Sequence, residues 1–163
     1  MALSWPWSYK AEDPAEYLDD VYRYSRARLG NREDAEDIAM EVVQSLPASC
    51  RRSDLRIYMI GIARRKVADR LRRHHPTVEI SENGKGTRFD HLADETMHIE
   101  HVLALLTDDQ REALTLKYVV GMTSEEVATA VGKSSEAVDS LLQRGRAAFA
   151  REWDALLSEQ VIS

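Results

Sequence analysis

The sequence predicts an all-α protein built from two small helical domains joined by a flexible linker. Three observations indicate this fold class: apolar residues recur at helical spacing in both halves, capping and stop residues bound these runs, and a stretch without periodicity separates them. The expected divisions are an N-terminal extension over residues 1–12, a first helical domain over 13–75, a linker over 76–97 and a second helical domain over 98–163.

The first helix is expected to begin after Asp13, whose carboxylate can cap it, because Pro14 suits the first helical position. Gly30 ends this helix, since glycine readily adopts the left-handed conformation of a helix C-terminus. A second helix, with apolar residues every three or four positions, follows and ends at Pro47. The two runs predict a pair of amphipathic helices that share a core.

A third and longer helix is expected from about Asp54 to Pro76, after a loop over residues 47–53. Its apolar row comprises Leu55, Tyr58, Met59, Ile62, Ala63, Val67 and Leu71. Three helices with such rows can bury one another, which predicts a small helical domain.

Two capping boxes mark helices in the second domain. The box that starts at Thr107 opens a helix through about Val119, and the box that starts at Thr123 opens a short helix that stops at Gly132. A last helix is expected from about Ser135, and its buried side should carry Val138, Leu141, Leu142, Phe149, Trp153 and Leu156. The short helix, the glycine turn and the longer helix have the spacing of a helix-turn-helix.

Basic residues are concentrated in one stretch of an acidic chain. The chain has a net charge of −6, yet residues 51–73 contain nine arginines and lysines against two aspartates, a local balance of +7. Gly61 and Ala68 share a helical face with Arg65 and Arg72, so a phosphate backbone could approach closely. Such a strip is either a solvated polar face or a binding site for a polyanion. The helix-turn-helix, a second DNA-binding signal in the same chain, favours nucleic acid.

The second helix carries a dense acidic row. Its members are Glu33, Asp34, Glu36, Asp37 and Glu41. Carboxylates near a helix N-terminus are favoured by the helix dipole, and the same row could dock on a basic protein surface. The residues alone leave these two interpretations open.

Composition argues against several other classes of protein. The single Cys50 excludes an internal disulfide and fits a reducing cytoplasm. No apolar run reaches the roughly 18 residues that a membrane helix needs, and the first nine residues lack the features of a signal peptide. His98 and His101 lie one turn apart without a further cluster of metal ligands. We therefore expect a non-enzymatic, cytoplasmic protein without membrane insertion, metal, cofactor or small-molecule substrate.

Taken in order, these parts resemble the extracytoplasmic-function (ECF) sigma factors of bacterial RNA polymerase, from about Glu12 to Glu152. In the first domain the matching residues are Tyr22 to Tyr24, Leu29 to Ile38, Ile62 to Arg64 and Asp69 to Arg73. In the second domain they are Leu106 to Glu112, Gly121 to Ala128, Ala137 to Val138 and Arg144 to Arg146. The resemblance implies a sigma region 2 domain over 13–75 and a winged-helix-like sigma region 4 module, the helix-turn-helix, over 98–163.

The resemblance implies three binding surfaces. The surface for the polymerase core comprises Asp34, Glu36, Asp37, Ile38 and Glu41. The surface for the minus-ten promoter element comprises Arg51, Arg52, Tyr58, Arg64, Arg65, Lys66, Arg72 and Arg73. The surface for the minus-thirty-five element comprises Lys133, Ser134, Ser135, Glu136, Ser140, Gln143 and Arg144. The implied partners are RNA polymerase core, promoter DNA and an anti-sigma factor, and docking becomes the preferred interpretation of the acidic row.

The chain departs from the family pattern at several of these positions. Tyr58 replaces a usual tryptophan, and Arg65 replaces a common asparagine. On the recognition helix, Glu136 replaces a frequent glycine, while Asp139 and Leu141 replace frequent basic residues. Because acidic and apolar side chains release no counterions from DNA, the second domain is expected to bind DNA weakly by itself.

The expected function is that of a specificity subunit, which joins RNA polymerase, directs it to promoters and helps to melt them without ATP. Two alternatives stay open. A stand-alone helix-turn-helix repressor would bind duplex DNA tightly without polymerase, usually as a dimer. A sigma-like decoy would occupy polymerase or an anti-sigma factor without starting transcription.

Overall fold

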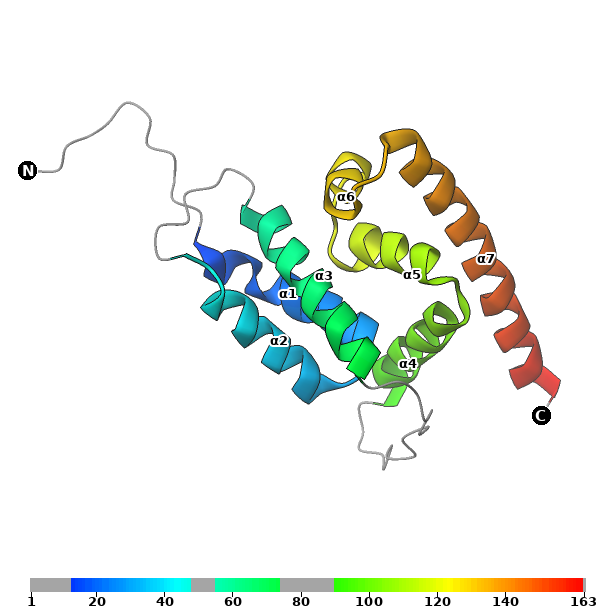
Figure 1. Cartoon of the computed structure of the whole chain (residues 1–163). Coiled ribbons are helices and arrows are strands. Elements are labelled where there is room, and N and C mark those ends of the chain that lie inside the picture. Colours follow the sequence, from blue (N-terminus) through cyan, green and yellow to red (C-terminus); the bar gives the residue numbers. More distant parts are fainter. Residues whose placement is uncertain (1–12, 48–54, 74–89, 163) are drawn as a thin grey trace, which may run out of the picture. The chain divides into compact units, whose positions relative to one another are not determined.

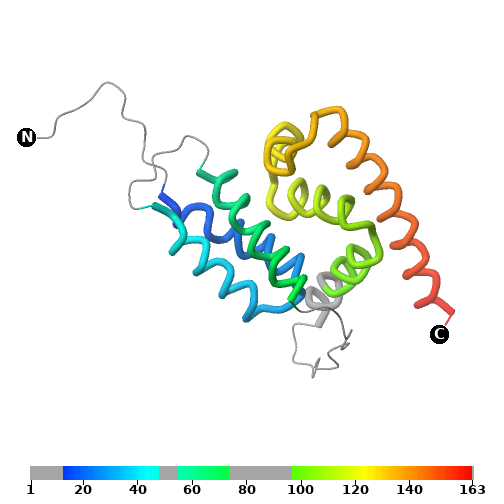
Figure 2. The backbone as a smooth tube through the Cα atoms, in the orientation of Figure 1, coloured from blue at the N-terminus to red at the C-terminus, as the bar shows by residue number. Residues whose placement is uncertain are grey.

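A computed structural model of the chain describes residues 13–47, 55–73 and 90–162, with side chains from residue 97 onward in the last range. These residues form helices and no strand, which confirms the predicted all-α fold class. The chain divides into two compact units, Met1–Arg70 and Leu71–Ser163. Figures 1 and 2 show the helices of each unit in chain order.

The first unit contains α1 (Pro14–Leu29), α2 (Arg32–Gln44) and α3 (Leu55–Arg73) up to Arg70, and we describe α3 as a whole with this unit. The carboxylate of Asp13 accepts a hydrogen bond from the backbone N–H of Ala15, at 2.9 Å, so the predicted cap is confirmed. α2 ends at Gln44 with Ser45 as its C-cap, and Pro47 then disfavours helical conformation at Leu46. The loop expected over 47–53, with Arg51 and Arg52, lies outside the described residues beyond Pro47.

All three helices of the first unit contribute to one core. The apolar side chains with at most 1% exposure are Val21, Tyr24, Ala35, Ile38, Val42, Leu55, Met59, Ile60, Ala63 and Val67. The predicted apolar row of α3 is wrong at its end, because Leu71 is 39% exposed. Steps of four residues advance about 40° each around a helix, so Leu71 has turned about 160° from Leu55. Ile60, which was not in the predicted row, is fully buried.

The second unit contains four α-helices and a short π-helix among the described residues. They are α4 (Asp90–Leu105), α5 (Asp108–Leu114), the π-helical η1 (Thr115–Val119), α6 (Ser124–Val131) and α7 (Ser135–Ile162). The chain is already helical from Asp90, within the range that we expected to be linker. Most residues in the first turns of α4 are acidic or polar, so the sequence shows no helical spacing of apolar residues there.

The predicted capping box at Thr107 is complete, and the N-cap bond of the box predicted at Thr123 is present. The Thr107 hydroxyl accepts from the backbone N–H of Gln110, whose side-chain oxygen accepts in return from the Thr107 N–H. The Thr123 hydroxyl accepts from the backbone N–H of Glu126, at 3.1 Å. Gly132 adopts a left-handed φ of 68° between α6 and α7, so the turn of the helix-turn-helix is present.

Close packing between α5 and α7 depends on Gly145. A Cβ atom at this position would lie 3.3 Å from Cγ of Leu114, so any side chain here would require Leu114 to shift. Leu141, also on α7, is 9% exposed and belongs to the core of this unit. No helix among the described residues is both long enough and apolar enough to cross a membrane.

Candidate nucleic-acid and protein interfaces

The acidic row of α2 has an outward part and a part that faces α3. The five residues expected to bind the polymerase core therefore have different environments. Glu36 and Asp37 are exposed, and the Asp37 side chain retains 67% of its accessible surface. Asp34 and Glu41 are only partly exposed and lie against α3. Ile38 is buried in the core, so its side chain supports the helix and is not available to a partner.

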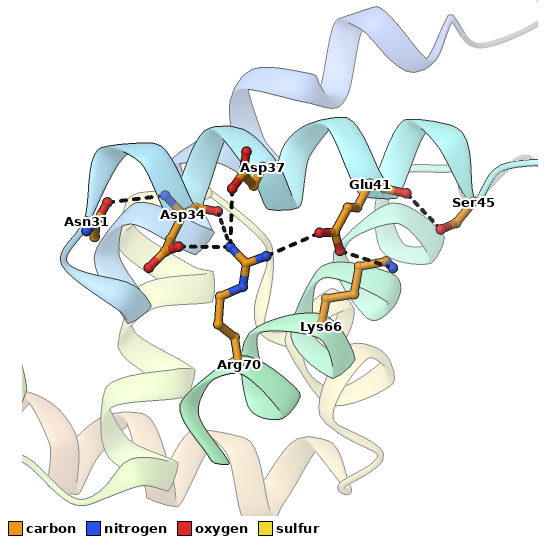
Figure 3. Close-up of polar contacts among 7 residues, drawn as sticks. All are labelled: Asn31, Asp34, Asp37, Glu41, Ser45, Lys66 and Arg70. Carbon is orange, nitrogen blue, oxygen red and sulfur yellow. Dashed lines mark hydrogen bonds and ion pairs between the residues drawn. The ribbon is translucent and has the colours of Figure 1, made fainter. Parts of the chain in front are cut away.

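Arg70 of α3 binds three carboxylates of this row. Its Nη1 lies 3.0 Å from Oδ1 of Asp34 and 3.8 Å from Oδ2 of Asp37, and its Nη2 lies 3.2 Å from Oε1 of Glu41. Figure 3 shows the guanidinium pointing toward all three residues. The planar fork of arginine suits such multiple contacts, and its charge offsets the mutual repulsion of the carboxylates. Arg70 therefore ties α2 to α3.

Lys66, one turn before Arg70, extends toward the same row. Its Nζ lies 3.4 Å from Oε2 of Glu41, so one carboxylate is shared between two cations of α3 (Figure 3). Lys66 was grouped with the minus-ten residues, and the structure places it on the side of α3 that faces α2. The Lys66–Glu41 pair thus joins a residue of one predicted surface to a residue of another.

The acidic face also contains an exposed apolar residue, Met40, that was not predicted from the sequence. Met40 is 57% exposed, between Glu36 and Asp37 on one side and Gln44 on the other along the helix surface. Glu36 itself pairs with Arg32, at 2.8 Å, and this hydrogen bond raises the pKa of the Arg32 guanidinium. A helical wheel of residues 32–44 could have revealed Met40, because it lies opposite the buried Ala35, Ala39 and Val42.

The outward face of α3 retains the predicted basic character. Arg65, Arg72 and Arg73 are exposed, as is Ala68. Gly61 has open space where a Cβ would stand, so no side chain there would keep a ligand away from the backbone of α3. The remaining minus-ten residues on α3 are partly exposed: Tyr58 and Arg64.

The positive charge that the basic stretch can offer to a binding partner is lower than its residue count indicates. Arg56 pairs with Asp20 of α1 at 2.9 Å, while Lys66 and Arg70 pair with α2. At least three of the basic residues that the structure describes in this stretch therefore have carboxylate partners on another helix. The sequence count did not detect these pairs, because their members are 25 to 36 positions apart along the chain.

The expected recognition face of α7 is exposed and chemically mixed. Its exposed residues are Ser135, Glu136, Asp139, Ser140, Gln143 and Arg144. The Ser134 hydroxyl accepts from the backbone N–H of Ala137 and so acts as a helix cap. Lys133 Nζ lies 3.8 Å from Oδ2 of Asp109 on α5. The side chain of Leu141 is buried, as the apolar spacing of this helix predicted, so it is not part of the exposed face.

An apolar groove lies between α4, η1 and α7 of the second unit. Its lining includes Ile99, Tyr118, Phe149 and Trp153, and the rings of Phe149 and Trp153 stack with centroids 5.8 Å apart. Arg146 at its edge donates to the hydroxyl of Tyr118, at 3.0 Å. Within the described residues, no cluster of three or more potential metal ligands is present.

Comparisons with known proteins match both units. The family model "Sigma-70 region 2" matches residues 15–77, and "Sigma-70, region 4" matches residues 97–149. The chain is 35% identical to "ECF RNA polymerase sigma factor SigD" of Mycobacterium tuberculosis over 136 residues, which cover 72% of this chain and 64% of that protein. It is 30% identical to "ECF RNA polymerase sigma factor SigC" of the same species over 155 residues, which cover 86% of this chain and 77% of that protein. The chain thus spans less than two thirds of the length of SigD.

A solved structure has the same fold. It is the sigma factor RpoE of Bartonella quintana, crystallised in complex with the anti-sigma factor NepR. The TM-score is 0.64 at 18% sequence identity, with 86% of this chain and 93% of that chain covered. This likeness supports the all-α, two-unit architecture.

Proposed function

The chain belongs to the ECF RNA polymerase sigma factors, and from this premise we propose that it joins the polymerase core in the cytoplasm, selects promoters and helps to open them. One observation carries the proposal most directly. In the first unit, α2 has an outward-facing acidic row and α3 has an outward-facing basic row. The ion pairs Lys66–Glu41 and Arg70–Asp34 lie between the two helices. Such a unit can bind a basic protein surface and a polyanion at the same time.

The docking surface that we propose centres on Asp37, Glu36 and Met40 of α2. The two carboxylates supply charge complementarity for a basic partner, and the exposed thioether supplies apolar contact area. Asp34 and Glu41 contribute less directly, because they are less exposed than Asp37 and lie closer to Arg70.

The proposed minus-ten surface is the outward face of α3, with Arg64, Arg65, Arg72 and Arg73. Its arginines would hold the phosphate backbone of a strand that has left the duplex. Binding the single strand better than the duplex offsets part of the unpairing free energy, so promoter opening needs no ATP.

The proposed minus-thirty-five surface is the exposed face of α7, preceded by α6 and the Gly132 turn. Glu136 and Asp139 on this face repel phosphates, so we expect weak binding by the isolated module. Attachment to a polymerase that already holds the minus-ten element raises the local concentration of promoter DNA and compensates for this weakness.

We include an anti-sigma factor among the proposed partners. The fold neighbour from Bartonella quintana was crystallised with such a protein, which supports the same class of partner here.

The test replaces Arg65 and Arg72 together by alanine. Holoenzyme with this variant should assemble normally and lose most run-off transcription, because the backbone contacts that hold the opened strand are removed. The matched control is Arg23→Ala with Arg151→Ala, which removes two positive charges from exposed sites on α1 and α7. Full transcription by the α3 double variant would refute the proposal.

A decoy function remains a second candidate because Glu136 and Asp139 are exposed on α7. A decoy would assemble with core polymerase and fail to transcribe even a premelted template. Transcription from that template by the wild-type holoenzyme would exclude it.

A further inference from the structure

We propose that the ion pair between Lys66 and Glu41 couples polymerase docking to DNA capture. The inference rests on the proposed function, in which α2 meets polymerase and α3 meets DNA. In the chain by itself, Lys66 forms an ion pair with Glu41. When a basic residue of the polymerase binds Glu41, Lys66 is released and can bind a phosphate of the promoter strand.

The geometry separates an anchored cation from an exchangeable one. Arg70 touches Glu41 through Oε1, at 3.2 Å, and also holds Asp34, at 3.0 Å, so it keeps a partner when Glu41 turns away. Lys66 reaches Oε2 of the same carboxylate at the longer distance of 3.4 Å. Its flexible stem carries a compact charge that can move to a new partner. Lys66 is therefore the member of the network that changes partners.

The strength of the pair is suited to exchange. The side chains of Lys66 and Glu41 are 29% and 41% exposed, so solvent screens their attraction. A pair of this kind is worth a factor of about two to five in an equilibrium constant. An incoming cation on the polymerase can therefore displace Lys66 without unfolding the contact between α2 and α3, which Arg70 and the apolar core maintain.

Lys66 is placed to serve the DNA surface once released. Arg73, seven residues later, lies on the same side of α3 as Lys66, and Arg65 lies about 100° around the helix, so Lys66 stands at the edge of the basic face. Coupling of this kind is reciprocal: DNA that draws Lys66 away leaves Glu41 more available to polymerase, by the same factor.

The first experiment measures binding of the full-length chain to a fluorescent single-stranded minus-ten oligonucleotide at low salt. Glu41→Gln should tighten binding about two- to fivefold, and this gain should vanish in the Lys66→Met background. The control is Asp19→Asn, which removes one negative charge from an exposed pair on α1 and leaves Lys66 in place. It should tighten binding by less than half as much as Glu41→Gln.

The second experiment compares Lys66→Met in the free chain and in holoenzyme on a forked promoter. We expect a two- to fivefold larger loss of DNA affinity in holoenzyme, where Lys66 is released. Equal losses in both, or a Glu41→Gln gain that persists without Lys66, would overturn the inference while leaving the proposed function intact. Failure of wild-type holoenzyme to bind the fork would overturn the proposed function, and the inference with it.

Discussion

The two helices expected to meet promoter DNA, α3 and α7, present different charge patterns. On α3, arginines occupy the outward face, and the carboxylates of α2 pair with cations on another side of the helix. On α7, Glu136 and Asp139 share the exposed face with Ser140, Gln143 and Arg144. Because affinity for DNA comes largely from phosphate neutralisation, the difference suggests that α3 supplies affinity and α7 supplies orientation.

The largest expected effect is a destabilisation of the second unit, which removes α7 from the comparison. Gly145→Val places a branched side chain where Leu114 leaves 3.3 Å for a Cβ, so the second unit should lose about 3 kcal/mol of unfolding free energy. Hydrogen exchange of the full chain would measure this loss unit by unit. Protection in α1, α2 and the first turns of α3 should stay unchanged, and a parallel loss there would show that the two units unfold together.

The next largest effect concerns the charges that hold the first unit together. Arg70→Met removes the cation shared by Asp34, Asp37 and Glu41, and we expect a loss of about 2 kcal/mol in unfolding free energy. Arg56→Met, which removes a partly buried arginine from the pair with Asp20, is the matched control and should cost about half as much. Urea unfolding followed by circular dichroism gives both values. Equal losses would mean that the multiple contacts of Arg70 add nothing.

These two cases indicate how far sequence alone could predict the molecule. The helices and their caps at Asp13, Thr107 and Thr123 were predictable, because capping depends on residues two or three positions apart. The sharing of Glu41 by Lys66 and Arg70 was not, since it requires the relative rotation of two helices that no local pattern contains. The core position of Leu141 was also predictable, because the apolar spacing of α7 places it on the buried side of the helix.

A smaller effect sharpens the comparison between the two DNA-facing helices. Arg65→Glu should weaken holoenzyme binding to forked promoter DNA about tenfold, because it replaces a phosphate contact by a repulsion. Ser140→Glu adds one acidic residue to a face that already holds Glu136 and Asp139, and we expect a loss of at most about threefold. Equilibrium fluorescence anisotropy at constant salt measures both. A larger loss at Ser140 would make α7 the main source of affinity.

The smallest expected effect tests the inference that the acidic residues of α7 weaken its binding to DNA. Asp139→Arg should tighten binding of the full chain to a duplex minus-thirty-five element about threefold and steepen its salt dependence by about one counterion. The control is Glu159→Arg, which makes the same charge change about 30 Å farther along α7, beyond the screening length at physiological salt. If the two variants gain equally, the gain comes from net charge alone. A gain confined to Asp139→Arg, and lost again as salt rises, would place this face of α7 against the phosphate backbone.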